Sequence, residues 1–156
     1  MNILIVDDEP SYRFLVKAAL EEEEGWTVFE AAHGEDGLDI LHDEKIDIII
    51  SDVYMPVMDG IKFHKNVRAM PAHTSTPFLF VSAYDDDYTK AAITNARTEG
   101  FVRKGKPVAF LKEWIRYLTT PADRRSIVPP SEEGKKADRP GRTRGRGDGG
   151  GRTPVY

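Results

Sequence analysis

The sequence has no cysteine among its 156 residues. Disulfide bonds, thiolate metal sites, iron–sulfur clusters and a cysteine nucleophile are therefore excluded. It also has no apolar run near the roughly 18–20 residues that a membrane-spanning helix needs. The apolar opening, residues 1–6, has no basic start and is too short for a signal peptide. We therefore expect a protein without a membrane segment that folds from its first residues, and we place it in the cytoplasm.

Positive charge is scarce over the first 120 residues, which carry 13 Lys and Arg against 21 Asp and Glu, a balance of −8. Residues 121–156 carry 9 against 5, and Gly and Pro supply 12 of these 36 positions. Because so few large apolar residues cannot offset the entropy lost on ordering, we predict a folded domain over 1–120 and a disordered tail over 121–156. The acidic domain disfavours nucleic-acid binding, and only the basic tail leaves a weak contact with RNA open.

The first 120 residues alternate two hydrophobic patterns. Short apolar runs rich in β-branched residues occur at five places: Ile3–Val6, Thr27–Ala31, Ile46–Ser51, Phe78–Ser82 and Gly100–Arg103. Segments with helical spacing of apolar residues separate these runs and follow the last one. The runs do not alternate strictly with polar residues, which is typical of strands buried on both faces of a parallel sheet. The pattern predicts an α/β fold, a three-layer sandwich with five parallel strands and five helices.

Polar side chains follow four of the predicted strands. Asp7 and Asp8 follow the first strand, Asp52 the third, Ser82 the fourth and Lys104 the fifth. Ligands of parallel α/β sheets bind beyond the carboxyl ends of the strands, so we expect these side chains to meet at one edge of the sheet.

The composition of this set favours a metal-assisted phosphoryl site. Carboxylates about 4 Å apart repel by about 1 kcal/mol in water and by about 4 kcal/mol at an effective dielectric constant of 20. Mg²⁺ relieves such repulsion, since it is commonly held by one or two carboxylates together with waters and phosphate oxygens. A lysine ammonium and a serine hydroxyl bind further phosphoryl oxygens, and a remaining carboxylate can act as the nucleophile and form an acyl phosphate.

These motifs resemble the receiver domain of bacterial two-component response regulators, in particular its stand-alone, chemotaxis type. The similarity covers about residues 1–118. The matching motifs are Asp7-Asp8, then Asp52 leading to Met55-Pro56 and Asp59-Gly60, then Ser82-Ala83 and Lys104. The resemblance implies a flavodoxin-like sandwich whose strands stand in the order 2-1-3-4-5.

The resemblance also implies how the site works. Asp52 would accept a phosphoryl group from a sensor histidine kinase or a phosphotransfer protein, and Lys104 would pair with that group. Asp7, Asp8, Asp52 and the backbone carbonyl of Tyr54 would hold Mg²⁺. On this interpretation the protein catalyses only its own phosphorylation and dephosphorylation, so it is not an enzyme in the ordinary sense.

Signalling would depend on two further residues. Ser82 would contact the phosphoryl group as a switch hydroxyl, and Phe101 takes the place of the switch aromatic. The resemblance implies a single-domain regulator that works by phosphorylation-dependent contact with a downstream protein. The sequence does not identify the kinase, that downstream protein, the stimulus, the phosphoryl lifetime or the oligomeric state.

Departures from the family pattern keep some alternatives open. The family lysine is usually followed directly by proline, whereas here Lys104-Gly105-Lys106-Pro107 separates them, so the position of any cis peptide in this loop stays open. One rival is an aspartyl-nucleophile phosphatase of haloacid-dehalogenase type, but such enzymes carry a second Asp where this chain has Tyr54. Another is an unphosphorylated receiver-like binding module. A dinucleotide-binding fold is disfavoured because no Gly-rich loop follows the first strand.

Overall fold

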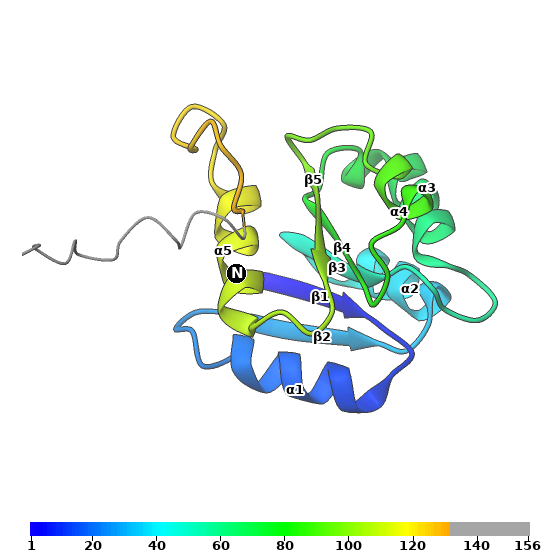
Figure 1. Cartoon of the computed structure of the whole chain (residues 1–156). Helices are drawn as coiled ribbons and strands as arrows, with labels where there is room; N and C mark the ends of the chain where they lie inside the picture. Colours follow the sequence, from blue (N-terminus) through cyan, green and yellow to red (C-terminus); the bar gives the residue numbers. More distant parts are fainter. Residues whose placement is uncertain (132–156) are drawn as a thin grey trace, which may run out of the picture.

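The structure is a computed structural model that describes residues 1–131. Strands and helices alternate along the chain (Figure 1). The strands are β1 (Asn2–Val6), β2 (Thr27–Ala31), β3 (Ile48–Asp52), β4 (Phe78–Ser82) and β5 (Glu99–Arg103). The helices are α1 (Pro10–Leu20), α2 (Gly34–Asp43), α3 (Gly60–Ala69), α4 (Asp87–Ala91) and α5 (Val108–Thr119), and a short 3₁₀ turn covers Pro71–His73.

The five strands form one sheet in the order β2-β1-β3-β4-β5, and every neighbouring pair is parallel. This confirms the fold and the strand order expected from the sequence. Every residue of β3 and β4 is buried, because helices cover both faces of the sheet. The uninterrupted apolar runs are therefore central strands of a three-layer sandwich.

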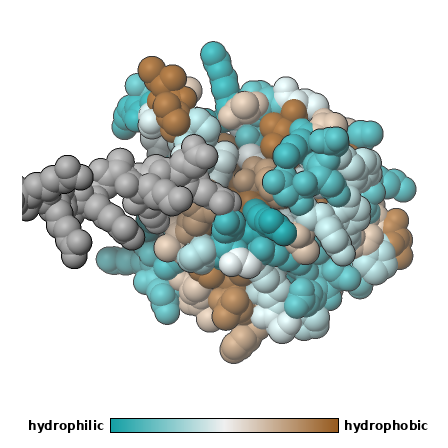
Figure 2. Space-filling model, in the orientation of Figure 1, coloured by the Kyte–Doolittle hydropathy of each residue, from teal (hydrophilic) through white to brown (hydrophobic). Residues whose placement is uncertain are grey.

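Each face of the sheet has its own hydrophobic core. On one face, Val16 and Leu20 of α1 and Ile115 of α5 pack against alternate residues of the strands. On the other, Leu41 of α2 and Phe63 of α3 pack against the residues between them. Figure 1 shows α1 and α5 on one side of the sheet and α2, α3 and α4 on the other. Figure 2 shows the result at the surface, where hydrophobic side chains are scattered among hydrophilic ones.

Two predicted elements have different limits in the structure. Pairing of β3 with β1 begins at Ile48, not at Ile46, because the side chain of Asp47, and not a backbone carbonyl of the predicted strand, accepts the N–H of Asn2, at 2.7 Å. The helical spacing of Ala91, Ala92, Asn95 and Ala96 predicts a helix near residues 88–96, but α4 ends at Ala91. The N–H groups of Thr94 and Asn95 donate to the carboxylate of Glu99 at 2.7 and 3.0 Å, so they are not available to extend the helix.

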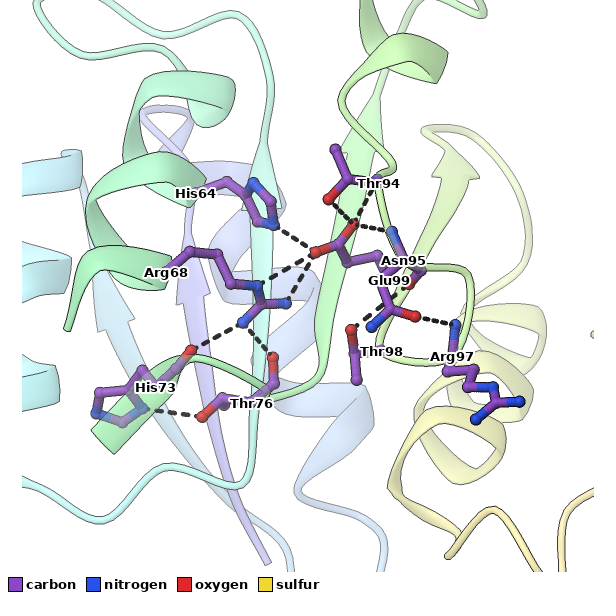
Figure 3. A network of polar contacts seen from close by, with 9 residues as sticks. All are labelled: His64, Arg68, His73, Thr76, Thr94, Asn95, Arg97, Thr98 and Glu99. Carbon is purple, nitrogen blue, oxygen red and sulfur yellow. Dashed lines mark hydrogen bonds and ion pairs between the residues drawn. The ribbon is translucent and has the colours of Figure 1, made fainter. Parts of the chain in front are cut away.

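Glu99 is the centre of a buried ionic network that joins α3 to the start of β5 (Figure 3). Its side chain is 1% exposed, and one of its oxygens lies 2.7 Å from His64 Nε2 and 3.2 Å from both Nε and Nη2 of Arg68. Arg68 also donates to the carbonyl oxygens of His73 and Thr76. The network lies at the amino end of β5, away from the polar strand ends, and therefore has a structural role. The sequence pattern did not predict it.

Residues 121–131, which we predicted as the start of the tail, are described by the structure, and Arg125 among them contacts α5. The rest of the predicted tail, residues 132–156, lies outside the described residues. Within residues 1–131, no helix combines the length and the apolar character that a membrane span requires.

Candidate functional site

The carboxyl ends of the strands bring together the side chains that the sequence singled out. Asp7 and Asp8 directly follow β1, Asp52 ends β3, Ser82 ends β4, and Lys104 directly follows β5. Because all five strands are parallel, these residues share one edge of the sheet. Asp7, Asp52 and Ser82 are buried there, at 1, 7 and 0% exposure.

The three aspartates form a cluster suited to a cation. Each offers a carboxylate oxygen, and these oxygens lie within 4.8 Å of one another. Asp7 Oδ2 is buried and faces the ammonium of Lys104 at 2.7 Å. A buried carboxylate oxygen with spare acceptor capacity, beside two more carboxylates, fits the oxygen-rich environment that Mg²⁺ prefers.

Lys104 lies at the centre of this cluster. Its Nζ is 2.7 Å from Asp7 Oδ2, 3.0 Å from Asp52 Oδ2 and 4.6 Å from the centroid of the Tyr12 ring. Burial by itself acts to lower the pKa of Lys104, but the two carboxylates outweigh burial and raise the pKa above its ordinary value. Lys104 is therefore a firmly held ammonium.

The loop after Lys104 accommodates the departure from the family sequence. Gly105 has φ of 90°, in the left-handed region that favours glycine. No peptide bond among residues 1–131 is cis, so neither Lys104–Gly105 nor Lys106–Pro107 is. The turn places Lys104, rather than Lys106, against the aspartates.

Asp52 has an unusual electrostatic environment for a carboxyl group. Burial is the main cause that raises its pKa above the ordinary value, and the charge of Asp7 raises it further. Lys104 and the N–H of Val53, which donates to Asp52 Oδ1 at 2.8 Å, oppose this rise. The carboxylate is thus held in a fixed orientation, with Oδ2 toward Lys104.

The proposed switch residues lie on neighbouring strands. Ser82 Oγ accepts the N–H of Tyr84 at 3.2 Å, and the carbonyl of Ser82 accepts the N–H of Lys104 at 2.8 Å. Phe101 pairs with Phe80 across β4 and β5 and is only partly buried. Its ring also lines a cavity of about 360 Å³ on the outer side of β5.

An aromatic cluster lies beside the strand ends. The rings of Tyr54 and Tyr84 meet edge to face with centroids 5.4 Å apart, and the ring of Tyr88 lies 6.2 Å from that of Tyr54. Tyr54 donates to Asp86, and Tyr88 donates to Asp59 at 3.0 Å. These contacts connect the loop after β3 to α4.

Sequence reasoning placed Tyr54 and Tyr84 beside the site, because they lie two residues beyond Asp52 and Ser82, but it missed the side chains of Tyr12 and Tyr88. Neither tyrosine lies at a strand end, so neither carries the signal that identified the aspartates. Tyr12 is in the first turn of α1, and burial raises the pKa of its phenol to about 12, so that the ring beside Lys104 stays neutral.

Gly60 fixes the loop that follows Asp52. Its N–H donates to Val53 O at 2.7 Å, and a Cβ added to Gly60 would lie 2.0 Å from the carbonyl oxygen of Asp52. Only glycine permits this close approach of α3 to the end of β3.

Comparison with known proteins gives a consistent result. The family model described as "Response regulator receiver domain" matches residues 3–116. An uncharacterised 14.6 kDa protein of Leptolyngbya boryana is 33% identical over 125 residues, which cover 79% of this chain and 95% of that protein. A probable chemotaxis protein CheY of Rhizobium etli is 35% identical over 86 residues, which cover 55% of this chain and 67% of that protein.

Solved structures agree with the sequence relatives. The crystal structure of chemotaxis protein CheY4 of Vibrio cholerae superimposes with a TM-score of 0.70 at 31% identity, and the match covers 75% of this chain and 97% of that one. The similarity therefore extends over nearly the whole of that chemotaxis protein.

Proposed function

The chain belongs to the response regulator receiver domain family, and from this premise we propose that it is a single-domain regulator phosphorylated on Asp52. One observation carries the proposal: Asp52 lies buried beside two further carboxylates, with its Oδ2 3.0 Å from Lys104 Nζ. A nucleophilic carboxylate needs such a setting, because an incoming phosphoryl group brings negative charge that the neighbouring cations must neutralise.

The phosphoryl donor would be a phosphohistidine on a sensor histidine kinase or a phosphotransfer protein. In the transfer, an oxygen of Asp52 forms a bond to phosphorus while the N–P bond breaks, and the histidine nitrogen keeps the electron pair and takes up a proton. Lys104 pairs with a phosphoryl oxygen and gives up its contact with Asp52 Oδ2. The product is an acyl phosphate, and its hydrolysis returns the carboxylate.

Asp7, Asp8 and Asp52 would hold Mg²⁺, together with the backbone carbonyl of Tyr54. The cation supplies charge neutralisation for the phosphoryl oxygens. The carboxylate oxygens of Asp7, Asp8 and Asp52, which lie within 4.8 Å of one another, support this assignment.

The signal would pass through Ser82 and Phe101 to a downstream protein. A phosphoryl dianion on Asp52 offers strong acceptor oxygens, and the Ser82 hydroxyl at the next strand end is a neutral donor that can turn toward them. Phe101 is only partly buried and can change its position when the loop after Ser82 moves. Phosphorylation would thereby shift the equilibrium between two arrangements of Ser82 and Phe101. We place the kinase and the downstream protein, like this chain, in the cytoplasm.

Intact-protein mass spectrometry with Mg²⁺ and acetyl phosphate tests the proposal. The wild type should gain one phosphoryl group that hydroxylamine removes. Asp52→Asn should gain none, whereas the control Asp39→Asn, at an exposed position of α2, should behave as the wild type. An unmodified wild type that nevertheless binds Mg²⁺ would refute the assignment and favour an unphosphorylated binding module. Turnover of an added phosphate ester would instead favour the phosphatase alternative.

A further inference from the structure

The segment that follows α5 folds back and is held by one arginine. Arg125 Nη2 donates to the carbonyl oxygens of Leu118 and Thr120 at 3.0 and 2.8 Å, and Nη1 donates to that of Arg97 at 2.5 Å. Its guanidinium also lies 4.9 Å from the centroid of the Tyr117 ring. A cation at the C-terminal end of a helix is favoured by the helix dipole, so this contact fastens the segment to the end of α5.

From this anchor the chain returns along the face formed by β5 and α5 (Figure 1). Ile127 and Pro129 line a cavity of about 590 Å³ together with Tyr117. Pro130 and Ser131 then line the cavity of about 360 Å³ that contains Phe101 and Trp114. Figure 2 shows hydrophobic side chains at the outer bend of the segment, where Ile127 is 97% exposed.

The segment has two points of attachment. Arg125 and Pro130 are its half-buried residues, and the other residues from 121 to 131 are exposed. Such a contact buries little surface, so it can open without unfolding the domain. The end of the segment lies at the cavity that contains Phe101, which is the residue proposed to move on phosphorylation.

The surface under the segment carries groups that a binding partner would use. Phe101, Phe110 and Trp114 are all only partly buried, whereas the Nε1 atom of Trp114 is itself buried and finds no hydrogen-bond acceptor among the described residues. Partly buried aromatic rings of this kind are enriched at protein–protein contacts.

We infer that residues 121–131 form a strap that occupies the β5–α5 face in the unphosphorylated protein and leaves it when Asp52 is phosphorylated. The strap and a protein partner would therefore compete for the β5–α5 face. This inference rests on the proposed function for its release step, whereas docking of the strap depends only on the contacts of Arg125 and Pro130.

The first experiment tests docking on the full-length, metal-free protein without any phosphoryl mimic. The probe is the indole N–H of Trp114 in ¹H–¹⁵N NMR spectra, assigned with Trp26→Phe. Arg125→Ala should shift this signal and speed its hydrogen exchange about tenfold, because net hydrogen bonds from a charged donor are worth about 1.5 kcal/mol. The control Arg124→Ala, at the neighbouring exposed arginine, should leave the signal unchanged.

A second variant guards against global damage by the first. Pro130→Gly leaves the arginine anchor intact and loosens only the far end of the strap, so it should shift the Trp114 signal in the same direction as Arg125→Ala. If both variants are folded and the Trp114 signal stays as in the wild type, the strap is not docked and the inference is wrong. A signal that returns to its strap-free position on dilution would mean that a second copy, not the same chain, covers the face, and would equally overturn it.

The second experiment tests release with beryllofluoride and Mg²⁺. In the wild type the Trp114 signal should move toward its position in Arg125→Ala. If the mimic perturbs Asp52 and its neighbours but not Trp114, the release step is wrong while the proposed function stands. If the mimic does not bind at all, the proposed function fails, and the docking result from the first experiment is unaffected.

Discussion

Replacing the buried Glu99 with Gln should destabilise the protein more than the same change of a carboxylate to an amide at an exposed glutamate. The two oxygens of the buried carboxylate face only donors: His64 and Arg68 on one side, and the Thr94 and Asn95 N–H groups on the other. Glutamine keeps one acceptor oxygen and replaces the second by an NH₂ group, which would point its hydrogens at other donors.

The size of the stability loss follows from the burial of the ion pair between Glu99 and Arg68. Removing one partner of a buried ion pair costs about 3–5 kcal/mol, because the other charge is left uncompensated. Arg68 keeps two carbonyl acceptors, at 3.0 and 2.7 Å, and its side chain is 18% exposed. We therefore expect the lower end of that range, about 3 kcal/mol, which is a large part of the 5–15 kcal/mol that typically stabilises a domain.

Urea denaturation at pH 7, followed by circular dichroism, measures this loss as a change in the free energy of unfolding. The control is Glu24→Gln, an exposed glutamate, for which we expect a change within about 0.5 kcal/mol. A loss below about 1 kcal/mol for Glu99→Gln would refute the reasoning, since it would show that the buried donors around Glu99 are satisfied without its second carboxylate oxygen.

The same network predicts how stability depends on pH. Burial lowers the pKa of His64 below its ordinary value of 6.5, and Glu99 opposes this. A neutral His64 therefore stabilises the folded state above pH 6.5, and this contribution is lost as the pH falls toward the lowered pKa. Without the carboxylate the pKa of His64 falls further, so the difference between wild type and Glu99→Gln should grow from pH 7 to pH 5.

At lower pH the wild type should in turn lose the contribution of Glu99. Burial acts to raise the pKa of Glu99, but the N–H groups of Asn95 and Thr94 and the contact with His64 outweigh it, and the pKa lies below its ordinary value of 4.5. The stabilisation is thus present above pH 4.5 and is lost as the pH falls through the lowered pKa. Repeating the urea titrations below pH 4.5 should show the two proteins converge.

Two further predictions concern the strand edge. Val57 has φ of 67° and is 88% exposed, so Val57→Gly should remove backbone strain without loss of packing. We expect urea denaturation to show a free energy of unfolding that is higher by about 1 kcal/mol. A decrease would mean that the valine side chain stabilises the loop. Asp8→Asn should stabilise the metal-free protein by about 1 kcal/mol in EDTA, because it removes one of three mutually repelling carboxylates, and should weaken Mg²⁺ binding in calorimetric titrations. A loss of stability in EDTA would contradict this electrostatic explanation.

Much of the candidate site could be predicted because a parallel sheet converts positions in the sequence into positions in space. Asp7, Asp52 and Ser82 each come at the end of an apolar run, and parallel strands align such ends at one edge. Lys104 follows the last apolar run and was predicted at this edge in the same way, and the structure adds its contacts with Asp7 and Asp52. The backbone turn at Gly105, with its φ of 90°, directs this lysine and not Lys106 toward the aspartates.

The end of α4 shows where local patterns were insufficient. The alanine-rich sequence after Tyr88 predicted a helix to residue 96, but the helix ends at Ala91. Helical spacing indicates only which residues can face a core. It does not indicate that the N–H groups of Thr94 and Asn95 donate to the carboxylate of Glu99 instead of continuing the helix. A tertiary partner thus overrides the local preference.

The sequence by itself determined the α/β class, the five strands and the acidic edge, since these depend on hydrophobic periodicity and on residues next to strand ends. The tertiary structure alone decided which distant groups become partners. Glu99 at the start of β5 meets His64 and Arg68 of α3, and Arg125 reaches the carbonyl of Arg97. Such pairs depend on how helices pack and where loops turn, and no periodicity in the chain encodes a contact between residues about 30 positions apart.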